Sequence, residues 1–426
     1  MMPPESKLVR IEKPVYGGAF LARLDGKAIF TPLTLPGEEA RIRIVEDKRA
    51  YAMAEAEEIV QAAPQRIAPD CRHFGACGGC HYQHADYEAQ VKFKREILLE
   101  TLERAGVRAS VEIDVLVAEP WRYRNRIRLA FDAAGDFGYR GRRSHAVVPI
   151  SECPIAAPIL LKAATAFTQA VRIVAPRLRP TEISLLCNAD ESALVVSVFV
   201  DRPAKESFND LARAWAEQVP SLAGVELVLS GRGDDRPRTV DRWGADSLAY
   251  HAAGFDYRVD HGAFFQVNRW LVDDLVERVA ADCKGKLVWD LYAGVGLFAR
   301  KLASKFERVV AVESASPSLA GLKENLKGVH AEAIQSDTLS FLRRQKDARP
   351  DLIVVDPPRT GLGPETATQL IRIAPPAITY VSCDPATLAR DLRALTSSGY
   401  TIEAVTLVDL FPQTFHLETM VKLRRN

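Results

Sequence analysis

The feature that most constrains the fold is a glycine-containing turn that follows an apolar strand in the C-terminal third of the chain. Residues 287–291 form a short apolar run, and Gly294 and Gly296 follow it at the start of a helical pattern. Glycine lets the backbone approach a ligand closely at such a turn. From residue 287 onward, apolar runs alternate with helical patterns. This predicts an α/β domain with an open, mostly parallel sheet covered by helices on both faces.

Acidic residues follow the next two segments of this predicted sheet. Glu313 comes directly after the apolar run 309–312, and Asp337 follows the next short segment. In this topology an acid at the end of the second strand can bind the ribose hydroxyls of a nucleotide, and Asp337 is placed to face the adenine amine. Ala299 stands where a dinucleotide fingerprint has its third glycine, so the pattern favours S-adenosylmethionine over NAD as the cofactor.

Two further predicted strands are followed by residues with reactive side chains. The run 352–355 leads into Asp356 and two prolines, and the run 378–381 leads into Ser382 and Cys383. The carboxyl ends of parallel strands meet at one edge of a sheet, where ligands bind. Cys383 is therefore placed to act as a nucleophile near the glycine turn. Position alone leaves a buried, inert cysteine as the alternative.

The cysteine count favours a metal site or a catalytic role over disulfides. The chain has seven cysteines, an odd number, and its start has no apolar signal-peptide core. We therefore expect a reducing cytoplasm rather than a disulfide framework. Cys71, Cys77 and Cys80 lie together in a loop rich in glycine and polar residues. No apolar run reaches the length of a membrane span.

The N-terminal part of the chain predicts a small β-barrel. Residues 7–60 alternate apolar and polar side chains between glycine turns. The blocks at 16–18, 23–27 and 35–38 resemble a TRAM domain, an OB-like RNA-binding barrel; a small β domain of another role is the alternative. A helical pattern follows at 87–106. Mixed helices and strands between the barrel and the glycine turn predict a central α+β domain.

The near-zero net charge of +1 conceals a local excess of arginine. Residues 121–131 alternate with a period of two, which predicts a strand with Arg122, Arg124, Arg126 and Arg128 on one face. Such a row suits contacts to RNA phosphates. A solvated strand face paired with carboxylates is the alternative.

Several blocks closely resemble those of the RNA 5-methyluridine (uracil-C5) methyltransferases, a class I S-adenosylmethionine-dependent family. The blocks are Asp290-x-Tyr292-x-Gly294-x-Gly296, Phe264-Phe265-Gln266-Val267-Asn268, Asp356-Pro357-Pro358-Arg359, Ser382-Cys383-Asp384-Pro385 and the segment 411–419. The order of barrel, cysteine loop, central domain and methyltransferase domain resembles the branch that modifies 23S rRNA. Met420 and Ala293 depart from the residues common in the family.

The resemblance implies that the chain methylates C5 of a uridine in 23S rRNA. Uracil C5 is a weak nucleophile until a thiolate adds to C6, and the resemblance gives that step to Cys383. It gives removal of the C5 proton to Glu418. Arg359 is a candidate to stabilise the thiolate. The residues that we expect to contact S-adenosylmethionine or the base are Gln266, Tyr292, Gly294, Gly296, Glu313, Asp337 and Asp356.

The resemblance also implies a 4Fe–4S cluster with four thiolate ligands. These ligands are Cys71, Cys77, Cys80 and Cys153, the last of which lies in a Cys-Pro pair. Zinc is the less favoured alternative, with Cys153, His81 or His84 as its fourth ligand. Methylation involves no electron transfer, so we expect the cluster to be structural or to contact RNA.

We expect three domains in a monomeric, cytoplasmic protein that does not bind membranes. Residues 1–62 form the TRAM-like barrel, 63–84 with 110–255 the central RNA-binding and iron–sulfur domain, and 85–109 with 256–426 the methyltransferase domain. The expected partner is 23S rRNA that presents a flipped-out or loop uridine. The sequence does not identify this uridine or say whether more than one is modified.

Three alternatives to this function are weighed. The first is the same reaction on tRNA, disfavoured because tRNA enzymes of this kind usually lack the barrel and the cysteine cluster. The second is amino-group methylation, disfavoured because Arg359 stands where the corresponding loop has an aromatic residue. The third is a non-catalytic, metal-stabilised RNA-binding scaffold, against which Cys383 and Glu418 argue.

Overall fold

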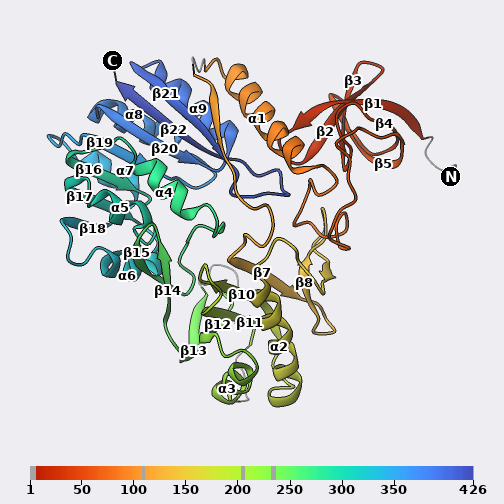
Figure 1. The fold of residues 1–426 in the computed structure, drawn as a ribbon, viewed down its shortest axis with the longest axis horizontal. Helices are drawn as coiled ribbons and strands as arrows, with labels where there is room; N and C mark the ends of the chain where they lie inside the picture. The colour runs from red at the N-terminus through yellow and green to blue at the C-terminus, as the bar shows by residue number, and fades with distance from the viewer. Residues whose placement is uncertain (1–5, 108–110, 203–206, 232–236, 426) are drawn as a thin grey trace.

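The structure is a computed structural model that describes residues 6–107, 111–202, 207–231 and 237–425. Figure 1 shows three parts: a barrel at one end, a large sheet with helices at the other, and a second sheet below them. Within the described residues, no helix combines the length and apolar character that crossing a membrane requires.

The first part is a closed five-stranded barrel with the strand order β1-β2-β3-β5-β4. Pairing of β1 with β4 closes it, and β3 runs parallel to β5. Its strands are β1 (Lys7–Val15), β2 (Ala19–Leu24), β3 (Lys27–Pro32), β4 (Glu39–Asp47) and β5 (Tyr51–Gln61). Ala40 and Ile42 are fully buried whereas Arg41 between them is exposed, so the predicted alternation is confirmed here.

The central part is a seven-stranded sheet with the order β13-β12-β11-β10-β7-β8-β9. Its strands are β7 (Arg126–Phe131), β8 (Phe137–Arg140), β9 (Val147–Pro149), β10 (Pro180–Cys187), β11 (Leu194–Val200), β12 (Leu222–Leu229) and β13 (Arg238–Gly244). Helices α2 (Pro158–Val174) and α3 (Phe208–Gln218) pack together against it. Trp215 of α3 is fully buried and donates its indole N–H to the carbonyl of Ala163 at 2.9 Å.

The arginine-rich segment does not form one continuous strand face, so that prediction is wrong. The backbone enters the left-handed region at Arg122, where φ is 51°, and β7 begins only at Arg126. Arg128 is ion-paired with Glu182 of the neighbouring strand. The alternation of residue types did not predict the start of the strand correctly, because an irregular extended segment can show the same alternation.

The third part is an eight-stranded sheet with the order β18-β17-β16-β19-β20-β22-β21-β6. Strands β16 to β20 are parallel and β22 is antiparallel to its neighbours, which confirms the predicted α/β class. The strands are β6 (Ile113–Leu116), β16 (Gly285–Leu291), β17 (Phe306–Glu313), β18 (Ala331–Gln335), β19 (Leu352–Val355), β20 (Ala377–Ser382), β21 (Tyr400–Val408) and β22 (Glu418–Arg425).

Helices cover both faces of this sheet, in two separate apolar cores. One face carries α4 (Val272–Ala280), α5 (Leu297–Leu302) and α6 (Ser316–Asn325). The other carries α1 (Tyr87–Arg104), α7 (Thr338–Arg344), α8 (Gly363–Ile373) and α9 (Pro385–Thr396). The predicted helix at 87–106 is confirmed as α1, which lies between the barrel and this sheet in Figure 1.

One strand belongs to a different part of the fold than the proposed domain boundaries indicate. We expected the central domain to resume at residue 110, but β6 pairs in parallel with β21 at the edge of the eight-stranded sheet. Segment 113–116 is therefore part of the C-terminal sheet. Four residues give too short an apolar pattern to show from sequence which sheet they join.

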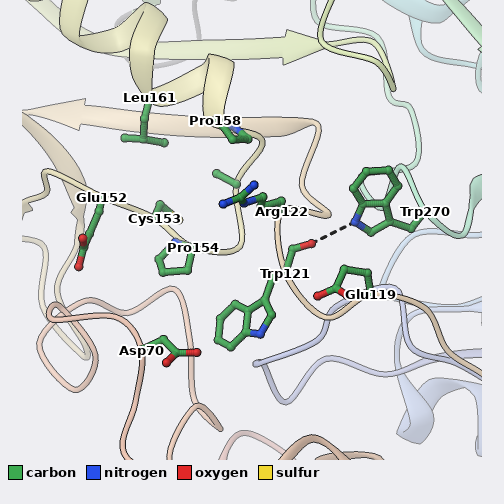
Figure 2. A pocket seen from close by; sticks show the side chains of 11 residues that line it. Asp70, Glu119, Trp121, Arg122, Glu152, Cys153, Pro154, Pro158, Leu161 and Trp270 are labelled. Carbon is green, nitrogen blue, oxygen red and sulfur yellow. Dashed lines mark hydrogen bonds between the residues drawn. The ribbon is translucent and has the colours of Figure 1, made fainter.

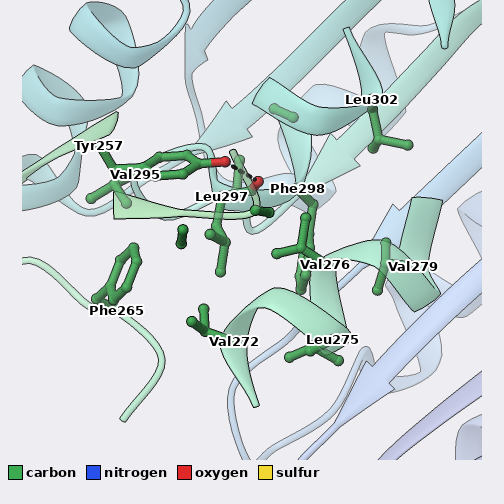
Figure 3. Packing of buried hydrophobic residues seen from close by; sticks show 14 of the residues in the cluster. Tyr257, Phe265, Val272, Leu275, Val276, Val279, Val295, Leu297, Phe298 and Leu302 are labelled. Carbon is green, nitrogen blue, oxygen red and sulfur yellow. Dashed lines mark hydrogen bonds between the residues drawn. The ribbon is translucent and has the colours of Figure 1, made fainter. Parts of the chain in front are cut away.

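A two-stranded hairpin and α4 support the glycine turn from outside the sheet. The hairpin consists of β14 (Ser247–Ala252) and β15 (Phe255–Asp260). Figure 3 shows Tyr257 and Phe265 packed with side chains of α4 and α5. The Tyr257 hydroxyl donates to the carbonyl of Leu297, the first residue of α5, at 3.1 Å. The helix that follows the glycine turn is thus fixed by a buried hydrogen bond.

A buried ion pair ties α1 to the segment that precedes β22. Lys94 and Asp409 are both almost completely buried, and Lys94 Nζ lies 2.5 Å from Asp409 Oδ1. Lys94 Nζ also donates to the carbonyl of Phe411 at 2.9 Å. The Tyr87 hydroxyl donates to the other Asp409 oxygen at 2.8 Å. Both charges are therefore hydrogen-bonded as well as paired, as burial of charge requires.

We predict that Lys94→Met lowers the free energy of unfolding by about 3–5 kcal/mol, because it leaves the Asp409 carboxylate buried and unpaired. Urea unfolding followed by circular dichroism measures the change. Lys92→Met is the matched control, since Lys92 lies on the same helix, is exposed and is 4.0 Å from Glu96. It should change stability by less than about 1 kcal/mol. Equal effects of the two substitutions would contradict a structural role for the buried pair.

Candidate active site

The turn after β16 has a backbone that brings its amide groups to the carboxyl edge of the sheet. Tyr292, Gly294 and Gly296 all lie in the left-handed region, with φ values of 64°, 56° and 87°. At Gly296 the left-handed backbone would strain any other residue, and a Cβ atom would lie 2.9 Å from Cδ1 of Leu322, which would have to move. At Gly294 a Cβ would meet nothing within 4 Å, so this part of the turn faces open space.

Glu313 is the last residue of β17 and is anchored to this turn. Its Oε2 accepts a hydrogen bond from the amide of Gly294 at 2.8 Å. Its Oε1 accepts from the amides of Ser314 and Ala315, both at 2.6 Å. The carboxylate is thus held at the edge where a nucleoside is expected to lie. The role of Glu313 as a ribose ligand stays a prediction.

Asp337 lies at the same edge, after β18, and caps helix α7. Its Oδ1 accepts from the amide of Ser340 at 2.8 Å, and these hydrogen bonds hold the pKa of the carboxyl below its usual value. The side chain is exposed, so the capping bond leaves its second oxygen open to solvent. Its predicted contact with an adenine amine also stays a prediction.

Asp290 is a candidate cofactor ligand that the sequence analysis did not single out. It lies within β16 with no exposed surface, and its Oδ2 accepts from the amide of Ala299 at 2.9 Å. Its Oδ1 is buried without a hydrogen-bond partner in the described part of the chain. Burial raises the pKa of this carboxyl to about 8. The signal was present, because Asp290 opens the motif that contains both glycines of the turn.

The sheet register brings Cys383 and Glu418 to the same edge. Cys383 follows the last residue of β20, and Glu418 is the first residue of β22, which is hydrogen-bonded to β20. Asp356 follows β19, the other neighbour of β20. Gln266 reaches the same place from the segment before α4, where its Nε2 lies 3.4 Å from Asp356 Oδ2. The four side chains come from four segments far apart in the sequence.

Burial controls the protonation of this group of side chains. It raises the pKa of Cys383 to about 12, and nearby Glu418 and Asp356 act in the same direction. Burial also raises the pKa of Asp356 to about 7 and that of Glu418 well above its usual value. Arg359 lowers the pKa of both Cys383 and Glu418. Its field therefore has the direction expected for thiolate stabilisation, but burial outweighs it in the free protein.

The segment 409–417, which leads into Glu418, is held by parts of the chain outside the sheet. Gln413 has a left-handed backbone with φ of 67°. Its carbonyl accepts from the amide of His81 at 2.8 Å, and its amide donates to the side chain of Gln90 at 3.0 Å. The cysteine loop and α1 therefore help to set the position of Glu418.

Tyr16, from the turn between β1 and β2 of the barrel, also reaches this edge. Its ring packs edge-to-face on Phe415, with the centroids 5.5 Å apart. Burial and a hydrogen bond to Asp384, the neighbour of Cys383, raise the pKa of the Tyr16 hydroxyl. No sequence pattern indicates this contact, because residues 16 and 384 belong to different parts of the fold.

The four cysteines proposed as ligands converge between the barrel and the central sheet. Cys153 raises the pKa of Cys71, Cys77 and Cys80 by its charge, although burial is the larger cause for each. Among the described residues, no group of three or more His, Cys, Asp or Glu side chains is arranged to hold a metal ion. This finding by itself supports neither zinc nor a cluster at these cysteines.

Arg124 provides a charge that suits an anionic group at these cysteines. Its buried guanidinium lowers the pKa of Cys77, Cys80 and Cys153. Its Nε is buried and has no hydrogen-bond partner among the described residues. A cluster with one thiolate on each iron spreads its four ligands farther apart than a single zinc ion does. The cysteines and Arg124 are therefore compatible with an iron–sulfur cluster.

The parallel sheet, the glycine turn and the anchored Glu313 define a class I methyltransferase domain, here joined to an N-terminal barrel. Residues 86–343 and 341–426 match the family model described as tRNA (Uracil-5-)-methyltransferase, and residues 5–56 match the TRAM domain. The chain therefore belongs to the tRNA (uracil-5-)-methyltransferase family of S-adenosylmethionine-dependent RNA methyltransferases, and it carries a TRAM domain. The family and the barrel predicted from the sequence are confirmed.

Similar proteins span nearly the whole chain. An uncharacterized RNA methyltransferase of Thermotoga maritima is 32% identical, over 97% of this chain and 98% of that protein. The 23S rRNA (uracil(1939)-C(5))-methyltransferase RlmD of Halomonas elongata is also 32% identical, over 97% of this chain and 88% of its own length. The Pyrococcus abyssi tRNA (uracil-54, C5)-methyltransferase, solved with S-adenosyl-L-homocysteine, superposes with a TM-score of 0.80. That structure is 24% identical and covers 97% of this chain and 99% of its own.

Asp290 gives a testable pH dependence. The folded protein holds the Asp290 proton more tightly than the unfolded chain, because burial raises its pKa to about 8. The stability that this neutral carboxyl contributes is therefore full below pH 4 and is lost as the pH rises toward 8. Asp290→Asn keeps a neutral group that can accept the Ala299 hydrogen bond. It should raise the free energy of unfolding by roughly 3–4 kcal/mol more at pH 8 than at pH 5. Urea titrations at both pH values measure this, and a pH-independent effect would contradict the raised pKa.

Proposed function

We propose that the protein methylates C5 of a uridine in 23S rRNA, with S-adenosylmethionine as the methyl donor. The observation that carries this proposal is the placement of Cys383 and Glu418 at the ends of adjacent strands, at the edge that also holds the glycine turn. A thiol and a carboxyl are the two groups that C5 methylation of uracil requires. The family membership of the chain agrees with this chemistry.

The proposed reaction needs one residue that bonds to the uracil ring and one residue that removes a proton from it. The Cys383 thiolate adds to C6 of uracil, which places electron density on C5 so that C5 can take the methyl group. Glu418 then removes the C5 proton, and the electrons of the broken C–H bond restore the ring double bond and expel the thiolate. Gln266 and Asp356, which lie within 3.4 Å of each other, are placed to hold the base or the donor. The bound donor supplies the methyl group.

Two lines of comparison point to different RNA substrates. Relatives named as 23S rRNA (uracil(1939)-C(5))-methyltransferases are 31% and 32% identical to this chain, which favours rRNA. We argued from the sequence that tRNA enzymes usually lack the barrel and cysteine loop. This argument does not discriminate, because a tRNA (uracil-54, C5)-methyltransferase superposes over 97% of this chain. Methylation of tRNA is therefore the second candidate function.

A basic cavity gives the RNA a place to bind. It has a volume of about 720 Å³, which is within the range typical of ligand sites, and lies between the barrel and the turn after β8. Its lining combines aromatic rings with guanidinium groups: Tyr16, Phe30, His81, Arg104, Arg140, Arg142 and Arg143. Arginine suits phosphate contacts and aromatic rings suit stacking with bases. Arg140, the last residue of β8, and Arg142 and Arg143, which follow it closely in the sequence, thus share this surface with the barrel.

We also propose that the cysteines hold a 4Fe–4S cluster. Support comes from the convergence of the four thiols and from the buried Arg124 beside them. The ligands would be Cys71, Cys77, Cys80 and Cys153. The cluster would join the cysteine loop to the central sheet, because Cys153 follows β9 and the other three precede α1. The monomeric state and the cytoplasmic location stay predictions from the sequence.

We predict a covalent adduct with RNA that contains 5-fluorouridine. Fluorine at C5 cannot be removed as a proton is, so the methylated Cys383 adduct should accumulate on 23S rRNA transcribed with this nucleoside. Denaturing gels and mass spectrometry detect it. Cys383→Ala should abolish the adduct, whereas Cys283→Ala, at a half-buried cysteine outside the site, should retain it. An adduct that forms with a tRNA transcript but not with 23S rRNA would establish the second candidate instead.

Glu418→Gln tests the base on ordinary RNA. Without the carboxylate the C5 proton stays, so we predict that a methylated adduct is trapped with unmodified uridine and that turnover falls by about 100-fold or more. Glu403→Gln is the matched control, because Glu403 lies on the neighbouring strand and pairs with Arg424 at the surface. Normal turnover by Glu418→Gln would remove Glu418 from this role.

We predict that protein prepared without oxygen is brown and contains iron and sulfide in equal amounts. Cys80→Ala should lose this colour, because each iron of such a cluster needs its own thiolate. Cys283→Ala should keep it. Elemental analysis makes the measurement, and stoichiometric zinc without iron would reverse the assignment.

A further inference from the structure

A second cavity, separate from the catalytic edge, is lined by two tryptophans. It has a volume of about 690 Å³ and lies between the cysteine loop, the segment before β7 and the start of α2. Figure 2 shows its lining, which is Asp70, Glu119, Trp121, Arg122, Glu152, Cys153, Pro154, Ala156, Pro158, Leu161 and Trp270. Only one of the four proposed cluster ligands, Cys153, borders it, so the cavity is not the cluster site.

Trp270 is held rigidly with part of its ring open. Its indole N–H donates to the carbonyl of Trp121 at 3.0 Å, drawn as a dashed line in Figure 2. The guanidinium of Arg269 lies over the Trp270 ring, 4.2 Å from its centroid, and is itself fixed by the carbonyl of Arg122 and the carboxylate of Glu191. Even so, 39% of Trp270 remains exposed. A ring supported in this way and left partly open suits stacking with another flat ring.

The carboxylates of the cavity select against phosphate and favour N–H donors. Asp70 and Glu119 are exposed and take part in no hydrogen bond or ion pair among the described residues. Glu152 is paired with Arg72 at 3.0 Å. Carboxylates accept hydrogen bonds from the exocyclic amines of nucleobases, whereas they repel the RNA backbone. Arg122 is the one guanidinium in the lining, and its backbone has a left-handed φ of 51°.

The cavity lies within reach of nucleotides next to the target uridine. Gln266, beside Asp356 at the catalytic edge, is only four positions before Trp270. Four residues span at most about 14 Å when fully extended. Asn268, between them, is fixed by a hydrogen bond to the carbonyl of Leu410 at 3.2 Å. One short, anchored segment thus borders both places.

We propose that this cavity binds one nucleobase with an exocyclic amine, extruded from the same RNA near the target uridine and stacked on Trp270. The inference rests on the proposed function, because the RNA is the source of the base. It makes Trp270 and the carboxylates of Asp70 and Glu119 determinants of which uridine is chosen. Unlike the basic cavity at the barrel, this site reads a base and not the backbone.

The test uses short oligoribonucleotides around the uridine at which the Cys383 adduct forms. Single abasic substitutions are placed at each flanking position, and KM for methylation is measured with the full-length protein. At one position, loss of the base should raise KM about 10-fold with wild-type protein. With Trp270→Ala the intact RNA should already show that higher KM, and the abasic substitution should add nothing. Ile173→Ala, at a residue of α2 that is 78% exposed, is the control and should behave as wild type.

Replacing the base at the sensitive position tests the role of the two carboxylates. At the sensitive position, uracil in place of an amino-bearing base should raise KM for wild type but not for the double variant Asp70→Asn, Glu119→Gln. Both carboxylates are exposed, so this variant should fold. The proposal is overturned if wild type methylates the RNA but no flanking position is sensitive, or if Trp270→Ala keeps the full abasic penalty.

A failure of the proposed function gives a different pattern. In that case wild-type protein methylates neither 23S rRNA nor tRNA transcripts and forms no adduct. The cavity is then tested by tryptophan fluorescence with AMP, CMP and UMP, in the presence of saturating S-adenosylhomocysteine. Quenching by AMP and CMP that exceeds quenching by UMP and is lost in Trp270→Ala supports a base site. Equal quenching in wild type and Trp270→Ala overturns it.

Discussion

The buried ion pair between Lys94 and Asp409 fixes the segment on which the catalytic edge depends. An ammonium without water is stable in a protein interior only if a charge and hydrogen-bond acceptors surround it. Here Asp409 and the carbonyl of Phe411 meet that need, so α1 and the segment 409–417 are bound to each other. The strand that begins with Glu418 follows directly. The position of Glu418 therefore depends on a helix whose Lys94 lies 315 residues before Asp409 in the sequence.

The segment 409–417 also contacts the barrel, the cysteine loop and the residues before the central sheet. The hydroxyl of Tyr123, next to the central sheet, donates to the carbonyl of Pro412 at 3.0 Å. His81 of the cysteine loop and Tyr16 of the barrel both pack on Phe415. A glycine is required at position 18 of the barrel turn, where a Cβ would lie 2.9 Å from His81. The parts that would bind RNA are thus joined to the catalytic edge through one short stretch of chain.

The sequence correctly predicted that Asp356 and Cys383 lie at one edge of the sheet, because open parallel sheets place the carboxyl ends of their strands side by side. Once the strands before Asp356 and Cys383 were recognised from their apolar runs, their meeting followed from topology. The arginine segment failed for the opposite reason. Arg124 forms isolated bridges to Ala156 and Asn268, both distant in sequence, and its charge lowers the pKa of Cys153. Local alternation contains no information about such partners, nor about the contact of Tyr16 with Asp384.

In the proposed reaction, the electrostatics of this edge would connect donor binding with proton removal. Burial raises the pKa values of Asp290, Asp356 and Glu418, so it favours the neutral form of each carboxyl. A positive charge beside buried carboxyls lowers their pKa. The donor in the proposed reaction carries a sulfonium charge and its product does not. Glu418 would therefore be driven toward the carboxylate, the form that can accept a proton, while the donor is bound, and Arg359 acts in the same direction throughout. If the proposed reaction holds, burial of these acids makes their ionisation depend on the positive charge of the bound donor.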